Sequence, residues 1–142
     1  MATEYKGQIQ KAGTSRFAKE MHHHSGSDGY VFQKGNPKFN LSERTNVWTG
    51  HKFIVWDNGQ KVTMQIWVDE NGDADPTKQN WKLMNEIVDD GHFGEPSNKD
   101  YPTKCNGSPQ QIFLFGGPTA VFRIDNVIVQ IKKASVRHII PG

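Results

Sequence analysis

Two runs of β-branched and aromatic residues flank Asn58 and Gly59, and this pattern constrains the fold more than any other feature of the sequence. Asn-Gly can supply the two positive-φ positions of a type I′ turn, so the runs predict the two strands of a β-hairpin. With Asn58 and Gly59 as the only loop residues, Asp57 faces Gln60, and the pairing continues outward in that register.

Successive side chains point to opposite faces of a strand, so this hairpin has two unlike faces. One face is apolar and should pack on a second sheet; it carries Phe53, Val55, Val62, Met64, Ile66 and Val68. The other face is mixed and carries Lys52, Ile54, Trp56, Lys61, Thr63, Gln65 and Trp67. Two Trp side chains are unusual on a sheet face that contacts only water. We therefore predict that Lys52, Trp56, Gln65 and Trp67 bind a flat, hydroxyl-rich ligand; a second core layer is the alternative reading.

The rest of the chain predicts a single all-β domain over residues 1–142. The chain has 14 Gly, 7 Pro and 11% aromatic residues, without long helical periodicity. Further strands are expected over residues 5–10, 16–22, 30–33, 81–88, 111–115, 120–125, 127–133 and 135–140. Residues 22–29, 34–46 and 89–109 are expected to be mainly loops. About eight to ten short strands separated by turns are typical of a two-sheet antiparallel sandwich or jelly roll.

Charge and targeting signals narrow the function classes. A net charge of +2, without clustered basic residues, argues against nucleic-acid binding. No apolar stretch is long enough to span a membrane, and the polar start of the chain lacks the apolar region of a signal peptide. The sequons at Asn40 and Asn106 favour a secreted or extracellular origin. Cys105 is the only cysteine, so it is either a buried free thiol or pairs with a partner outside this chain.

Two stretches have the composition of metal sites. Asp69, Asn71, Asp73 and Asp75 are two residues apart, like the oxygen ligands of a Ca²⁺ loop. Such a loop also needs Gly at its sixth position and Glu at its twelfth, and their absence favours a plain acidic turn. Residues 22–24 are three consecutive histidines, but alternation sends neighbours to opposite faces, which favours a solvated loop over a transition-metal site. The sequence therefore predicts either no cofactor or Ca²⁺.

Several segments together resemble one family. In order, they are RFAKEM, GHKFIVWDNGQKVTMQIWVD, WKLMNEIVDDG, QQIFLFGGPTAVFRIDN and SVRHI. This order resembles concanavalin A-like (jelly-roll) lectin/glucanase domains, and among them the group of alginate-lyase-like polysaccharide lyases and related secreted proteins. The resemblance covers most of the chain, which is short for a complete lyase. It implies polysaccharide or oligosaccharide binding across a concave sheet.

The resemblance also implies a set of candidate catalytic residues. They are Arg16, Glu20, His22, Tyr30 and Arg123. In β-elimination on a uronate, Arg would neutralise the carboxylate while His or Tyr takes the C5 proton. The family's motifs match in part: its Arg and Glu are two residues apart, whereas these are four apart, and Phe113 replaces the motif His. An ion pair across strands is the alternative reading.

Three function classes follow from the sequence. The first is binding of an extracellular polysaccharide, an acidic one in view of the Lys and Arg on the mixed faces. The second is a polysaccharide lyase that acts on uronate polymers. The third is a self-assembling surface protein, because free sheet edges can pair with another copy of the chain and form a homo-oligomer.

Overall fold

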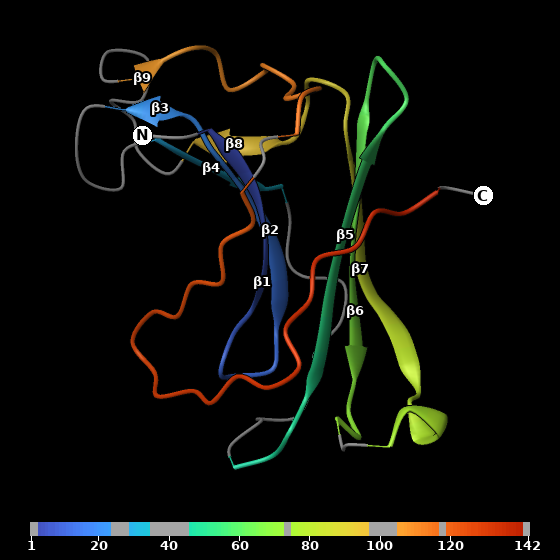
Figure 1. Cartoon of the computed structure of the whole chain (residues 1–142). Helices are drawn as coiled ribbons and strands as arrows, with labels where there is room; N and C mark the ends of the chain where they lie inside the picture. The colour runs from blue at the N-terminus through green and yellow to red at the C-terminus, as the bar shows by residue number, and fades with distance from the viewer. Residues whose placement is uncertain are drawn as a thin grey trace.

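The computed structural model is all-β, as the sequence predicts (Figure 1). It describes residues 3–23, 29–34, 46–72, 75–96, 105–116 and 119–140. Within these residues the strands are β1 (Glu4–Ile9), β2 (Ser15–Glu20), β3 (His22–His23), β4 (Tyr30–Gln33), β5 (Gly50–Asp57), β6 (Val62–Asp69), β7 (Trp81–Asp89), β8 (Gly94–Pro96) and β9 (Cys105–Asn106). One 3-10 helix, η1 (Pro76–Lys78), precedes β7.

The strands form two main antiparallel sheets. One has the order β1-β2-β4-β8 and the other the order β5-β6-β7, while β3 and β9 form a separate two-stranded sheet. The two main sheets stand face to face in a sandwich-like arrangement (Figure 1). The prediction of two antiparallel sheets is confirmed at this level.

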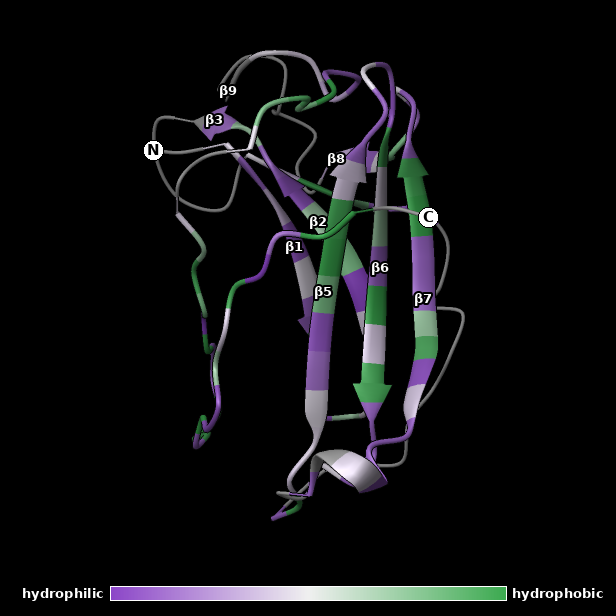
Figure 2. Cartoon of the chain, turned by 45° about the vertical axis from the view of Figure 1, so that its right-hand side comes forward, coloured by the Kyte–Doolittle hydropathy of each residue, from purple (hydrophilic) through white to green (hydrophobic). Residues whose placement is uncertain are grey.

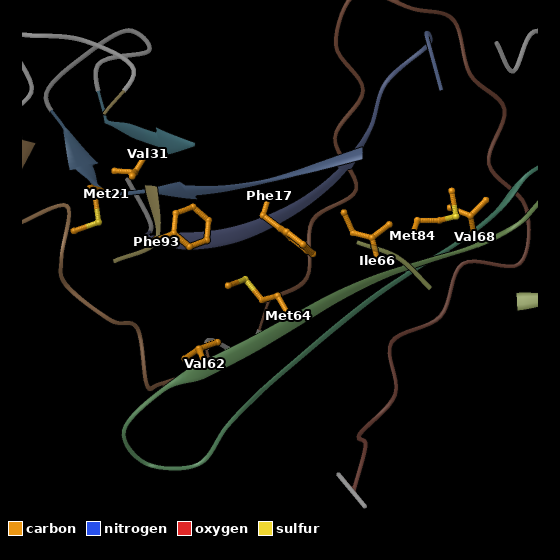
Figure 3. Close-up of a cluster of buried hydrophobic side chains, with 9 residues drawn as sticks. All are labelled: Phe17, Met21, Val31, Val62, Met64, Ile66, Val68, Met84 and Phe93. Carbon is orange, nitrogen blue, oxygen red and sulfur yellow. The ribbon is translucent and has the colours of Figure 1, made fainter. Parts of the chain in front are cut away.

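The core lies between the two main sheets. Its fully buried side chains include Phe17 of β2 and Met64 and Ile66 of β6, which approach each other in Figure 3. Along β6, buried and half-buried residues alternate as expected for a strand with one face on the core. Removal of this apolar surface from water is the main force that holds the sheets together.

The predicted register of the central hairpin is wrong by two residues. Asp57 pairs with Val62, so residues 58–61 form a four-residue loop. The Asn58 side chain accepts hydrogen bonds from the backbone N–H groups of Gln60 (3.2 Å) and Lys61 (3.0 Å). Within this loop only Gly59 has a positive φ, of 84°, whereas a type I′ turn needs two such residues. The shift is even, so the alternation of the faces is kept, although Lys61 moves into the loop. Val55, which was expected to pack on the second sheet, is 42% exposed because it lies close to the loop end of the hairpin.

Lys19 is an unusual member of the core. Phe17, Lys19 and Met21 occupy alternate positions of the strand predicted over residues 16–22, and all three are fully buried. The Lys19 ammonium lies 2.8 Å from Asp89 Oδ2 and 2.8 Å from the carbonyl oxygen of Gln111. Tyr5 donates its hydroxyl to the same carboxylate oxygen at 2.6 Å. Burial lowers the pKa of Lys19, and the ion pair with Asp89 opposes this shift.

Two segments predicted to be loops contain strands. His22–His23 pairs with Cys105–Asn106, although both lie in predicted loops. Within the predicted loop 89–109, β8 adds to the edge of the first sheet by pairing with β4. A Cβ on Gly94 would lie 1.6 Å from the carbonyl oxygen of Phe32, so this pairing requires glycine.

The strands predicted after residue 110 are absent. Residues 111–115 form no strand, although Ile112, Phe113 and Leu114 pack against the core. Residues 120–125, 127–133 and 135–140 are also without strand structure, and in 119–140 every residue except Ile139 is exposed. Alternating apolar residues make a segment suitable for a sheet, but a strand forms only where an edge is available to pair with it.

We expect Asp89→Ala to destabilise the fold by about 3–5 kcal/mol, because it leaves the Lys19 charge buried without its partner. The matched control is Asp90→Ala, one residue away and exposed, which should cost at most ~0.5 kcal/mol. Urea unfolding followed by circular dichroism measures both. Similar losses in the two variants would show that the ion pair does not hold the sheets together.

Candidate functional site

The outer face of the β5-β6-β7 sheet carries three indoles. Trp56 of β5, Trp67 of β6 and Trp81 of β7 are each half-buried. We call this surface the indole face. Figure 2 shows the three strands that carry it side by side. Trp56 and Trp67 are not enclosed in a second core layer.

Trp67 is held in place by a chain of hydrogen bonds. Its Nε1 donates to Gln65 Oε1 at 2.8 Å, and Gln65 Nε2 donates to Glu86 Oε2 at 2.5 Å. These contacts orient the indole and leave the amide of Gln65 with one further N–H for another acceptor.

Lys52 lies on Trp81. Its Nζ is 3.7 Å from the centroid of the indole, which is cation–π geometry. Burial lowers the pKa of Lys52, and the nearby positive charge of Arg137 adds to this effect. Lys52 therefore contacts a third indole, that of Trp81, which the sequence did not reveal as part of the site.

The sequence did not place Trp81 on the indole face, because the pairing of β6 with β7 contains a register shift. The pairing is irregular between Ile66 and Trp67, so alternation along β7 changes its sense partway along the strand. Trp81 pairs with Asp69, and its ring reaches Gly50, where an added Cβ would come within 2.8 Å of it. A bulge of this kind cannot be located from periodicity alone.

The three indoles are distributed along the sheet. Trp56 faces Thr63, Trp67 is four residues further along β6, and Trp81 faces Asp69. At roughly 3.3 Å per residue the row covers about 20 Å. Such a row is longer than one sugar ring and suits an extended ligand.

A second polar cluster lies on the outer face of the β1-β2-β4-β8 sheet. The Tyr30 hydroxyl oxygen lies 2.9 Å from Lys6 Nζ and 2.9 Å from an Arg123 guanidinium nitrogen. Lys6 also forms an ion pair with Glu20. We call these four residues the Tyr30 cluster. It contains three of the five predicted catalytic residues, together with Lys6, which the sequence did not reveal as a member.

Both cations of the Tyr30 cluster are held in their charged form. Burial lowers the pKa of Lys6, but its hydrogen bonds to Glu20, Tyr30 and Glu4 outweigh burial and raise the pKa overall. Hydrogen bonds to Asp125 and Tyr30 raise the pKa of Arg123. The cluster therefore places two positive charges on one phenol oxygen.

The remaining predicted catalytic residues, Arg16 and His22, do not belong to the Tyr30 cluster. Arg16 shares the sheet face, but it donates to Gln8 and stacks on Phe32 at 4.3 Å. The Phe32 ring stacks in turn on Tyr30 and so separates the two residues. His22 belongs to β3, in the separate two-stranded sheet.

The predicted Ca²⁺ ligands that the structure describes have other partners. Asp69 is buried and accepts from the backbone N–H of Asn71 at 3.0 Å. Asp75 caps η1 by accepting from Thr77. Asp73 lies outside the described residues. Within the described part of the chain, no group of three His, Cys, Asp or Glu side chains is arranged to hold a metal ion.

In comparisons with protein-family models, curated proteins and solved structures, nothing matches this chain. The resemblance to concanavalin A-like domains therefore stays a prediction. The helix that the structure describes, η1, is a three-residue turn, and no described helix is suited to span a membrane.

If the indole face is a surface rather than a second core, Trp67→Ala should cost only about 1–2 kcal/mol of unfolding free energy. Phe17→Ala, in the core proper, should cost about 3–5 kcal/mol. Chemical denaturation of both variants measures the difference. A loss at Trp67 as large as that at Phe17 would assign the indole to packing.

Proposed function

We propose that this protein is a secreted, concanavalin A-like β-sandwich that binds an acidic polysaccharide on its indole face. One observation carries the proposal: three half-buried indoles lie on one outer sheet face, in a row of about 20 Å. A face that only met water would favour polar side chains, because each exposed indole keeps apolar surface in contact with solvent.

The chemistry of the indole face suits a sugar. The C–H faces of a pyranose stack on indole rings, and polar side chains between the rings bind hydroxyl groups. Gln65 lies next to Trp67 and retains an N–H, while Thr63 faces Trp56 across the hairpin. These groups provide both parts of such a site.

Local charge favours an acidic sugar. Lys52 lies on Trp81, and Arg137 of the C-terminal segment is close enough to affect its pKa. A carboxylate bound here would relieve the repulsion between the two cations. The negative charge of Asp69 opposes the effect of Arg137 on Lys52 and so partly balances this positive charge.

Affinity electrophoresis tests this proposal, with polygalacturonate and alginate as acidic polymers and hydroxyethyl cellulose as a neutral one. Wild-type protein should be retarded by an acidic polymer. Trp56→Ala and Trp67→Ala should each weaken binding about tenfold, since each removes a stacking contact. The matched control, Trp48→Ala, removes an exposed indole outside the sheet and should leave retardation unchanged. Equal retardation of all variants would contradict the proposal.

The Tyr30 cluster supports a second function, β-elimination on a uronate polymer. A base that removes the C5 proton needs cations beside it to stabilise the negative charge that develops on the substrate carboxylate. Lys6 and Arg123 both contact the Tyr30 hydroxyl, so a base and two cations meet at one place. Tyr30 would take the C5 proton, the electron pair of the C5–H bond would form a C4–C5 double bond, and the C4–O bond would break. The departing oxygen would leave with the rest of the polymer and take a proton from water, and an unsaturated sugar would remain.

Ultraviolet absorbance of that unsaturated product tests the second function on the same polymers. Tyr30→Phe should reduce product formation at least ~100-fold, the usual contribution of a general base. Lys6→Met should also reduce it, whereas Lys34→Met, which removes an exposed cation from the end of β4, should not. No product from wild-type protein, with retardation retained, would leave sugar binding as the function.

A further inference from the structure

Two contacts with the rest of the chain flank residues 124–131 of the C-terminal segment. Arg123 donates to the Tyr30 hydroxyl at 2.9 Å, and Lys132 Nζ lies 4.0 Å from the centroid of the Trp48 ring. Residues 124–131 extend between these contacts, and we call them the C-terminal arm. Figure 1 shows this part of the chain, in orange to red, looping away from both sheets.

The C-terminal arm has the composition of a strand. Four of the five residues in 127–131 are Val or Ile, which favour pleated, half-buried positions. Ile124, Val127, Val129 and Ile131 are 43 to 52% exposed, and Ile128 is fully exposed. A run of exposed β-branched side chains in an extended segment is typical of a strand that lacks its neighbour.

The edge at β7 offers a suitable position for such a strand. β7 is nine residues long and is the last strand of its sheet, so among the described residues no strand pairs with the other side of its backbone. An open hollow of about 370 Å³ lies beside it. The hollow has an apolar part, formed by Ile87, Val88 and Phe93, and a polar part, formed by Gln33, Lys34, Glu86 and His92. Apolar side chains on an added strand could enter this hollow.

The arm does not lie near this edge in its own chain. In Figure 2 the arm hangs on the side of β1 and β5, whereas β7 forms the opposite edge of its sheet. Its contacts with Tyr30 and Trp48 hold it there. These contacts do not prevent the arm from reaching the β7 edge of another molecule.

We propose that residues 127–131 add as a strand to the β7 edge of a second copy of this chain. Backbone hydrogen bonds to β7 provide the pairing, and alternate Val and Ile side chains fill the hollow beside Val88 and Phe93. This proposal is independent of sugar binding, because it uses neither the indoles nor the Tyr30 hydroxyl.

Multi-angle light scattering over a range of concentrations tests the association. The mass of wild-type protein should rise above 16.1 kDa as concentration increases. Val129→Pro removes a backbone N–H and cannot enter a sheet ladder, so it should weaken association about tenfold or more. The matched control is Ala120→Pro, which lies in the same exposed coil outside the arm and should associate like wild type.

The acceptor edge has its own test. Val88 is 43% exposed, and Val88→Lys places a charge at the β7 edge, so it should weaken association to a similar degree. Val129→Pro keeps an intact edge and Val88→Lys keeps an intact arm, so mixing the two variants should restore association. A wild-type protein that stays at 16.1 kDa, association that survives both substitutions, or a mixture that stays monomeric would overturn the proposal.

Discussion

The buried ion pair between Lys19 and Asp89 brings four segments of the chain together: β1, β2, β7 and the stretch that begins at Gln111. Lys19 belongs to β2 and Asp89 to the end of β7, so the pair joins the two main sheets inside the core. Burying an ammonium group costs several kcal/mol, and the cost is offset only when its partners are well placed. The carbonyl of Gln111 and the hydroxyl of Tyr5 complete the arrangement.

This arrangement also determines where the chain goes after β9. Phe113 donates its backbone N–H to the Tyr5 hydroxyl at 3.0 Å, and its ring contacts that of Tyr5. Residues 111–114 are therefore held against the core by polar contacts with side chains rather than by a sheet ladder. The chain then leaves the core, which is why Arg123 reaches Tyr30 from outside the first sheet.

The indole face and the Tyr30 cluster both lie on the outer face of a sheet, and each exists because its sheet has an inner face on the core and an outer face away from it. The inner faces are apolar apart from Ser15, the Lys19–Asp89 pair with the Tyr5 hydroxyl, and an amide pair between Gln33 and Asn85. Each outer face combines aromatic rings with cations: Lys52 on Trp81 in one sheet, Arg16 on Phe32 in the other. Such contacts allow aromatic rings to remain at a surface because their faces are partly covered by amphipathic side chains.

The sequence by itself determined the all-β class, the central hairpin and the direction of its side chains, because alternation depends only on the parity of positions along a strand. For that reason, the error of two residues in the predicted register did not change the sheet face on which Trp56 and Trp67 lie. Tertiary structure alone decided which residues meet. Trp81 lies on the indole face because of a bulge, and Lys6 of β1 reaches Tyr30 of β4. β8 pairs with β4 because Gly94 leaves room for the carbonyl oxygen of Phe32. Tertiary structure also decided that residues 120–140 form no strand, although apolar and polar residues alternate there. A strand needs a free sheet edge within reach, and the local sequence does not determine where such edges lie.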